Sequence, residues 1–441
     1  MSCFFLVPHT RRDQTWLVLG AAAGAAFAYH RYATSRAAPQ RGVASVSRED
    51  YGDASHALYT LRNGNGMTVK VSSLGCALTE VVVPTGSGAS VDVVCGYDSL
   101  HAQQQGKHNF GTIVGRYANR IRGGKYSLDH DEFTLNTNNG PNHLHGGPSG
   151  FFSRNFDLVS ATVTDSSVDL KLAYFSPDGE EGYGGDLAVT MTYSLSRGKR
   201  DALTMIFEGT AGVGGSASRT PSHRATVVNL TNHAYWNLCG HASGPAALLS
   251  HELWLPRSSE YTVVDASLAT TGETAPVRGG SATDVVDLDY LSGWKKVDPR
   301  LDHNFCVGEC VGRGELHEEG IEEGMVTVAM LQAPSSTSSP GGKRLRMLVS
   351  SNQVGVQIYA GGGIDPRNPQ WQVPAKGGVT YQRNGAICIE TQNWPDALNH
   401  AEKTSAEDSN AFAKHCPSSV IRPGAPKQYR HVATYAFQMV D

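Results

Sequence analysis

Hydrophobic and polar residues alternate with a period of two along most of the chain beyond Leu58, which predicts β-strands. The clearest cases are FDLVSATVTDSSVDLKLAYF and DLAVTMTYSLSRGKRDALTMIFEGT, where alternate positions are apolar over many residues. Shorter apolar runs follow as MVTVAML, LRMLVSS, GVQIYAG, GAICIET and HVATYAFQMV. No stretch carries a 3.6-residue apolar period over three turns, so the pattern favours an all-β sandwich.

Two segments place turn residues between strand-like runs. LYTLRNGNGMTVKVSSLG has two such runs around an Asn-Gly pair, which is a strong hairpin signal. GKYSLDHDEFTLN repeats the arrangement, with a predicted polar turn from Asp129 to Glu132. The 49 glycines and 20 prolines among 441 residues also indicate a turn-rich chain of short strands.

Three polar segments interrupt the strand pattern, at residues 208–225, 308–324 and 399–427. The first two predict surface insertions between strands, and the third predicts a long loop before the last strand. We expect residues 51–441 to form one large β-sandwich domain. We expect residues 1–50 to be an N-terminal extension that takes no part in it.

The extension contains an apolar run from Trp16 to Tyr29, preceded by Arg11 and Arg12. It is shorter than the roughly 20 residues of a membrane span. It resembles the apolar part of a signal peptide, with an A-x-A site at residues 26–28. A cleaved signal, membrane anchoring through residues 16–29 and organelle targeting all remain open. A dispensable extension on a cytoplasmic enzyme is the alternative.

Charge and cysteine content narrow the range of partners. Lys and Arg total 37 and Asp and Glu total 41, a net charge of -4 that gives no reason to expect nucleic acid. Eight irregularly spaced cysteines do not form a disulfide framework, and we expect buried free thiols. Cys306 and Cys310 lie near His303, but no second cysteine pair completes a metal site, so we expect no metal.

Candidate chemistry lies in six polar clusters. They are GTIVGRYANRIRGGKY (111–126), NNGPNHLHGG (138–147), NLTNHAYWNL (229–238), LDHNF (301–305), VGVQIYAGG (354–362) and AICIETQNWPDALNH (386–400). Glu390 follows the apolar triplet at residues 387–389. A carboxylate at the end of a buried strand must have hydrogen-bond or ionic partners, stay protonated, or take part in catalysis. Together with the nearby aromatic residues Trp236, Tyr359 and Trp394, the clusters favour a hydroxyl-rich ligand such as a sugar.

On these stretches the chain resembles the aldose 1-epimerase family, also called galactose mutarotases. The matching segments are IVGRYANRI, NGPNHLHGG, SPDGEEGYGG, NLTNHAYWNL, LDHNF, GVQIYAG, CIETQNWPDA and RPGAPKQYRHVATYAF, in the family's order and over about residues 53–441. The resemblance implies a large antiparallel β-sandwich of the galactose mutarotase-like type, with few short helices. It implies an isomerase that interconverts the α and β anomers of free aldohexoses such as glucose and galactose, without a cofactor.

Carried over by matched motif, the resemblance implies that Glu390 is the general base and His233 the general acid. It implies that the substrate is bound by Asn119, Arg120, His145, Asp302 and Gln357, with Tyr235 at the cleft wall. Mutarotation needs a base on the anomeric hydroxyl and an acid on the ring oxygen. A histidine, which titrates near neutrality, suits the second task.

Three other functions remain possible from the sequence. A relative acting on a phosphorylated hexose would need extra cations, which Arg122 or Arg367 would supply. A non-catalytic sugar-binding module would lose the acid–base pair, and a glycosidase would pair a second carboxylate, such as Asp302, with Glu390. After GVQIYAG the segment GGIDPRNPQWQ departs from the family pattern, so we expect a different cleft wall there. We expect a monomer or a weak dimer.

Asn229 also begins a glycosylation sequon, Asn-Leu-Thr. If the stretch NLTNHAYWNL is a buried strand, we expect this sequon to stay unmodified even in a secretory compartment.

Overall fold

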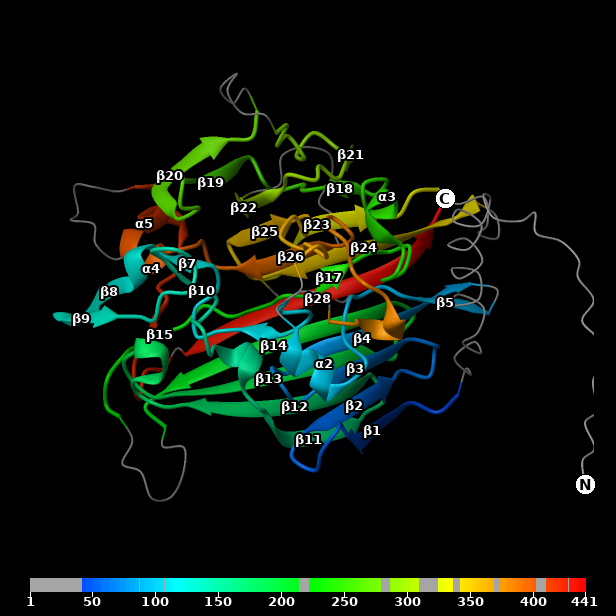
Figure 1. The fold of residues 1–441 in the computed structure, drawn as a ribbon, viewed down its shortest axis with the longest axis horizontal. Helices are drawn as coiled ribbons and strands as arrows, with labels where there is room; N and C mark the ends of the chain where they lie inside the picture. The colour runs from blue at the N-terminus through cyan, green and yellow to red at the C-terminus, as the bar shows by residue number, and fades with distance from the viewer. Residues whose placement is uncertain are drawn as a thin grey trace, which may run out of the picture.

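Strands dominate the computed structural model and form three larger antiparallel sheets (Figure 1). It describes residues 42–86, 88–106, 108–213, 222–278, 286–308, 324–335, 342–368, 373–401, 410–426 and 428–441. The predicted all-β architecture with few short helices is confirmed.

The nine-stranded sheet runs in the order β11 (Asp157–Val163), β12 (Ser167–Ser176), β13 (Leu187–Ser196), β14 (Asp201–Ala211), β28 (Tyr429–Val440), β24 (Arg344–Ser351), β23 (Val326–Gln332), β18 (Glu252–Trp254) and β21 (Lys295–Lys296). The six-stranded sheet runs in the order β17 (Tyr235–Trp236), β26 (Ile387–Gln392), β25 (Gly355–Tyr359), β22 (Asp302–Cys306), β19 (Glu260–Val264) and β20 (Thr270–Pro276). The five-stranded sheet comprises β1 (Ser45–Asp50), β2 (Ala57–Arg62), β3 (Thr68–Ser72), β4 (Ala77–Gly86) and β5 (Ala89–Asp92).

Short strand pairs and helices connect these sheets. The pairs are β7 (Arg120–Ile121) with β10 (His143–Leu144), β15 (Thr226–Val227) with β27 (Val420–Ile421), β16 (Thr231–Asn232) with β6 (Ile113–Val114), and β8 (Lys125–Leu128) with β9 (Asp131–Thr134). The α-helices of the described residues are α2 (Leu100–Gln105), α3 (Gly244–Leu248), α4 (Ala397–His400) and α5 (Ala411–His415).

Both predicted hairpins form. Strands β2 and β3 pair around the Asn-Gly turn, with Arg62 opposite Thr68. Strands β8 and β9 also pair, but their turn is shorter than predicted because only Asp129 and His130 lie between them. Both residues have positive φ, 52° and 72°, as a tight two-residue hairpin turn requires.

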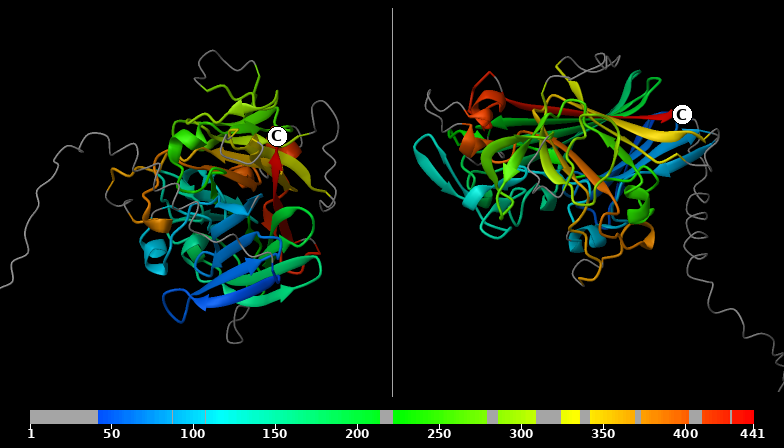
Figure 2. Two further views of the ribbon diagram at one scale, coloured as in Figure 1. Left: turned by 90° about the vertical axis from the view of Figure 1, so that its right-hand side faces the viewer. Right: turned by 90° about the horizontal axis from the view of Figure 1, so that it is seen from above.

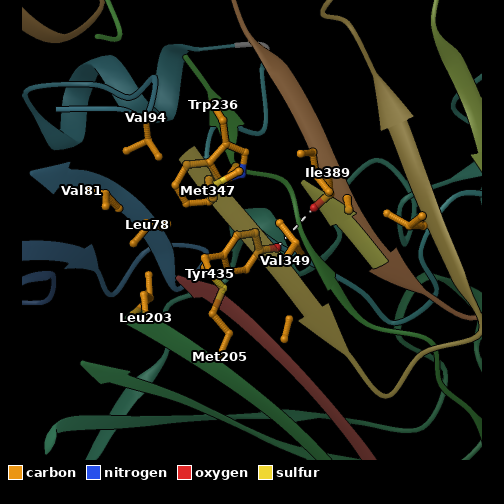
Figure 3. Close-up of a cluster of buried hydrophobic side chains, with 14 of the residues drawn as sticks. Leu78, Val81, Val94, Leu203, Met205, Trp236, Met347, Val349, Ile389 and Tyr435 are labelled. Carbon is orange, nitrogen blue, oxygen red and sulfur yellow. Dashed lines mark hydrogen bonds between the residues drawn. The ribbon is translucent and has the colours of Figure 1, made fainter. Parts of the chain in front are cut away.

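The hydrophobic core lies between the nine-stranded sheet and the other two sheets (Figure 3). In β13 and β14 buried positions alternate with half-buried ones, which reproduces the alternation of the sequence. Tyr435 of β28 stacks on Trp236 of β17, with ring centroids 4.9 Å apart, and its hydroxyl donates to the carbonyl of Ile389 at 3.2 Å. Seen from above, β28 (red) and β24 (yellow) lie along one side of the molecule (Figure 2, right).

The structure corrects the boundaries of two predicted segments. The insertion expected at 208–225 starts later, because β14 continues to Ala211. The loop expected at 399–427 contains α5 and β27. Residues 214–221, 309–323 and 402–409, within the three predicted insertions, lie outside the described residues.

The N-terminal apolar run and two of the eight cysteines lie outside the described part of the chain. The apolar run of residues 16–29 lies outside it, and no helix inside it is long and apolar enough to span a membrane. Of the predicted buried free thiols, Cys76, Cys95, Cys306 and Cys388 are confirmed, whereas Cys239 and Cys416 are free but only partly buried. Cys3 and Cys310 lie outside the described residues.

Candidate active site

The six-stranded sheet has one apolar face and one polar face. In β25 and β26, Val356, Ile358, Ile387 and Ile389 point into the core. Successive side chains of a strand alternate between faces, so the residues between them point the other way. Glu390 is therefore not at the end of its strand, as the sequence suggested, but inside β26 on the face away from the core.

Strand register places a row of polar side chains across this second face. Asn304 of β22 lies opposite Gln357 of β25, which in turn lies opposite Glu390 of β26. Asp302 is two residues before Asn304 and therefore on the same face. One row across three neighbouring strands thus combines residues that are far apart in the sequence.

His233 reaches this row from a break between two short strands. The stretch NLTNHAYWNL is not one strand, because β16 ends at Asn232 and β17 begins at Tyr235. Backbone hydrogen bonds hold His233 in the break: its N–H donates to the carbonyl of Thr112, and its own carbonyl accepts from Gly111, each at 2.9 Å. Asn232 braces the same loop, because its Nδ2 donates to the Gly111 carbonyl at 2.7 Å.

His233 and Glu390 form a buried pair, with Nε2 and Oε1 3.9 Å apart. Burial raises the pKa of Glu390 to about 8, and the charge of Asp302 adds to this effect. Burial lowers the pKa of His233 to about 4. The other ring nitrogen, Nδ1, shares a hydrogen bond with the thiol of Cys388 at 3.4 Å, and Oε2 of Glu390 has no hydrogen-bond partner among the described residues.

Asn119 and His145 hold each other in place beside the pair. The backbone N–H of Asn119 donates to Nδ1 of His145 at 3.2 Å, which leaves the ring proton on Nε2. The backbone N–H of His145 donates in return to the Asn119 carbonyl at 3.1 Å. The His145 ring lies 5.2 Å from that of His233, and its pKa falls well below the ordinary value because it is buried and near that second ring.

A chain of amide hydrogen bonds links the remaining predicted residues. Nδ2 of Asn119 donates to Oε1 of Gln357 at 3.1 Å, and Nε2 of Gln357 donates to Oδ1 of Asp302 at 2.7 Å. Arg120 is fixed through Nε, which donates to Oδ1 of Asn139 at 2.9 Å. Asn119, Arg120, Asp302 and Gln357 line one pocket of about 290 Å³, part of it open to solvent. His233 and Glu390 are not among its lining residues; Glu390 lies one strand further along the sheet, on β26, with His233 beside it.

Of the aromatic residues considered from the sequence, two are in the site. Tyr235 stacks on His233 with ring centroids 5.0 Å apart, and the Tyr359 ring lies 6.2 Å from that of Tyr235. Trp236 points into the core, and Trp394 packs against Phe412. The two tryptophans therefore pack inside the protein, although they are close in sequence to the polar clusters.

The three arginines of the first polar cluster have different surroundings. Arg116 is buried, and its guanidinium donates to main-chain carbonyls including those of Gly185 and Pro177. Arg122 pairs with Asp265 at 2.5 Å. Only Arg120 lines the pocket.

Among the described residues, His233, Cys388 and Glu390 are the one group whose donor atoms could hold a metal ion, all within 4.8 Å of one another. These donor types suit Zn²⁺. An ion there would occupy both members of the buried pair.

Two polar residues of the pocket were not predicted as site residues. Asn304 and Thr262 both line it and are 3% and 2% exposed. The signal for Asn304 was its spacing, because a residue two positions after Asp302 in a strand shares its face. Thr262 lies in β19, in a segment with no motif to single it out.

The antiparallel β-sandwich has a galactose mutarotase-like fold. The structure is similar to those of galactose 1-epimerase from Lactobacillus acidophilus, with a TM-score of 0.65 at 20% identity, and the aldose epimerase homologue from C. elegans, with 0.63 at 23%. Each comparison covers 90% of this chain and 100% of the other. At these identities they support the fold alone.

The sequence comparisons define the family. The aldose 1-epimerase family profile matches residues 57–409. Galactose mutarotases of Sus scrofa and Homo sapiens are each 32% identical, over 413 and 410 residues, which is 90% of this chain and 100% of theirs. The aldose 1-epimerase of Escherichia coli is 27% identical and covers 86% of this chain and 94% of its own length. The chain belongs to the aldose 1-epimerase family, whose members are isomerases acting on carbohydrates.

Proposed function

We propose that this protein interconverts the α and β anomers of free aldohexoses such as glucose and galactose, with His233 and Glu390 as the proton-transferring pair. The observation that carries the assignment of the pair is its geometry. Two titratable groups with opposite pKa perturbations lie 3.9 Å apart, beside a pocket lined by amides, a carboxylate and a guanidinium. Perturbed groups in a polar cleft are typical of acid–base catalysis.

The reaction opens and closes the pyranose ring. A base removes the proton of the anomeric hydroxyl while an acid protonates the ring oxygen, and the bond between C1 and that oxygen breaks to give the aldehyde. Rotation about the C1–C2 bond presents the other carbonyl face. The ring oxygen then attacks C1, its proton returns to the protein, and the carbonyl oxygen regains a proton.

At neutral pH the pair of Glu390 and His233 carries one titratable proton. The reaction needs this number, because one group must accept a proton while the other donates one. The order of the two pKa values places that proton on Glu390, whereas the roles implied by the family resemblance place it on His233. Sugar hydroxyls that donate to the carboxylate favour its charged form. We infer that substrate binding lowers the pKa of Glu390 and leaves His233 as the proton donor.

The remaining site residues would bind and orient the sugar. Asp302 and Gln357 offer acceptors and donors to hydroxyls at the pocket, and Arg120 and Asn119 line the same pocket. His145 is fixed so that its Nε2–H can donate. Tyr235 supports the ring of His233.

A phosphorylated hexose is a weaker candidate substrate. Arg122 is paired with Asp265, and Arg367 is paired with Asp365 at 2.8 Å, so both suggested cations already have anionic partners. Neither arginine is among the lining residues of the pocket. Asp302 is the second carboxylate that a glycosidase would need. Its Oδ1 accepts a hydrogen bond from Nε2 of Gln357.

Polarimetry of freshly dissolved α-glucose and α-galactose tests the proposal. We expect the protein to accelerate the approach to anomeric equilibrium, and His233→Asn to lower kcat by about 10²- to 10⁴-fold, as loss of a proton-transfer group does. Circular dichroism would establish that the variant is folded. A wild-type protein that binds sugar without accelerating mutarotation would instead be a binding module.

A further inference from the structure

The side chain of Asn304 is buried, lines the pocket and has no hydrogen-bond partner among the residues that the structure describes. It is 3% exposed, and neither its Nδ2 nor its Oδ1 is hydrogen bonded within the described part of the chain. Buried amides are nearly always paired, because an unpaired one loses its hydration without compensation. An amide left open inside a polar pocket points to a ligand that completes it.

Thr262 repeats this arrangement on the neighbouring strand. Tyr261 of β19 pairs with Phe305 of β22, so the next residue along, Thr262, lies beside Asn304. The hydroxyl of Thr262 is buried and likewise lacks a hydrogen-bond partner among the described residues. Both side chains line the same pocket as Asp302 and Gln357.

The strand register sets the position of this pair relative to the reacting groups. Asn304 lies two strands from Glu390, with Gln357 between them. Neighbouring strands are about 4.8 Å apart, so Asn304 is roughly 10 Å from Glu390 across the sheet. A pyranose whose anomeric carbon is at Glu390 extends past Gln357 and presents its opposite edge toward Asn304.

We propose that Asn304, together with Thr262, forms a subsite for the hydroxyl groups on carbons 3 and 4 of the sugar, at the ring edge opposite the anomeric carbon. The inference rests on the proposed function for the orientation of the ring. A carboxamide suits this task because one oxygen accepts and one nitrogen donates, so two neighbouring hydroxyls can be bound together. The hydrogen bonds from Asn304 to these hydroxyls are the same in the closed sugar and during ring opening. They therefore affect KM and leave kcat nearly unchanged.

The test is a cycle of two protein forms and three sugars. Wild type and Asn304→Ala are compared on glucose, 3-deoxyglucose and 4-deoxyglucose by polarimetry. We expect Asn304→Ala to raise KM for glucose about tenfold, with kcat changed less than about twofold. We expect 3-deoxyglucose and 4-deoxyglucose, which each lack one of the two bound hydroxyls, to have a raised KM with wild type and a smaller further rise with the variant than glucose shows.

A merely structural role would give a different result. It would lower kcat or raise KM by the same factor for all three sugars, and either outcome would overturn the subsite. If Asn304→Ala does not fold, the near-isosteric Thr262→Val takes its place in the same cycle. An unchanged KM for glucose would then overturn the proposal.

Binding measurements separate this inference from the proposed function. Titration calorimetry with glucose reports affinity whether or not the protein accelerates mutarotation. If wild type binds glucose without catalysis, the proposed function fails. The subsite is then supported if Asn304→Ala weakens glucose binding about tenfold and weakens 3-deoxyglucose and 4-deoxyglucose binding by smaller factors, and it is overturned if the factor is the same for all three sugars.

Discussion

Replacing Glu390 by glutamine should make the protein more stable and less active at the same time. The folded state holds the Glu390 proton up to about pH 8, whereas an unfolded chain releases it near 4.5. Between these values the folded state binds more protons, so the free energy of unfolding of the wild type falls as pH rises. Glutamine keeps the shape of the protonated carboxyl and does not titrate.

The size of the effect follows from the two pKa values. The interval from 4.5 to about 8 corresponds to about 5 kcal/mol at about 1.4 kcal/mol per pH unit. This is an upper limit, because local relaxation and water entry reduce the cost of the buried charge. We expect equal stabilities of Glu390→Gln and wild type near pH 5, and a more stable variant near pH 8. The rate should fall by about 10²- to 10⁴-fold, since the amide cannot accept a proton.

Urea unfolding followed by circular dichroism at pH 5, 6.5 and 8 measures these differences. Glu208→Gln is the matched control, because the Glu208 carboxylate accepts from Lys171 at 2.9 Å and this contact lowers its pKa. The stability contributed by Glu208 is present above its unfolded pKa and is lost as pH falls. The control should therefore be less stable than wild type at neutral pH. A Glu390→Gln variant that is also less stable at pH 8 would mean that the carboxylate is paired and structural, and the reasoning would be wrong.

Three further results are expected. The pH profile of kcat/KM should be bell-shaped, with loss of activity below about pH 4, where His233 and Glu390 both carry protons, and above about pH 8, where neither does; a flat profile from pH 6 to 10 would contradict this. Mass spectrometry of protein made in a secretory host should find no glycan at Asn229, which is 0% exposed; an attached glycan would mean that the loop opens. Gly111→Ala should lower the free energy of unfolding by more than about 2 kcal/mol, since Gly111 has a φ of +67° and an added Cβ would lie 2.0 Å from the Leu78 carbonyl oxygen. Thermal unfolding would detect this loss, and an unchanged melting temperature would show that the turn can relax.

The sheet strands were the most predictable part of the molecule. Strands such as β13 bury every second residue, so the two-residue period of the sequence carries straight into the structure. The stretch around His233 was predicted less well. Its apolar residues suggested one strand, but the bonds that break it come from Gly111 and Thr112, which are distant in the sequence. Local patterns do not contain such tertiary hydrogen bonds.

The candidate site was predicted only in part. The polar motifs identified Gln357 and Glu390 separately, but their juxtaposition depends on the register of β25 against β26. The placement of the aromatic residues likewise depends on the strand, because Trp236 is next to Tyr235 in sequence and therefore on the opposite face of the sheet. Asn304 was visible as a polar neighbour of His303, and its missing partners became apparent only in the folded chain.

The strand β28 affects how the protein can be made. It lies between β14 and β24 in the nine-stranded sheet, although it follows every other described strand along the chain. A growing polypeptide therefore leaves the backbone groups along the edges of β14 and β24 unpaired until Tyr429–Val440 has been synthesised. The nine-stranded sheet should therefore form late and slowly, with a need for chaperone protection. A variant that lacks Tyr429–Val440 should be insoluble, although His233 and Glu390 would both be present.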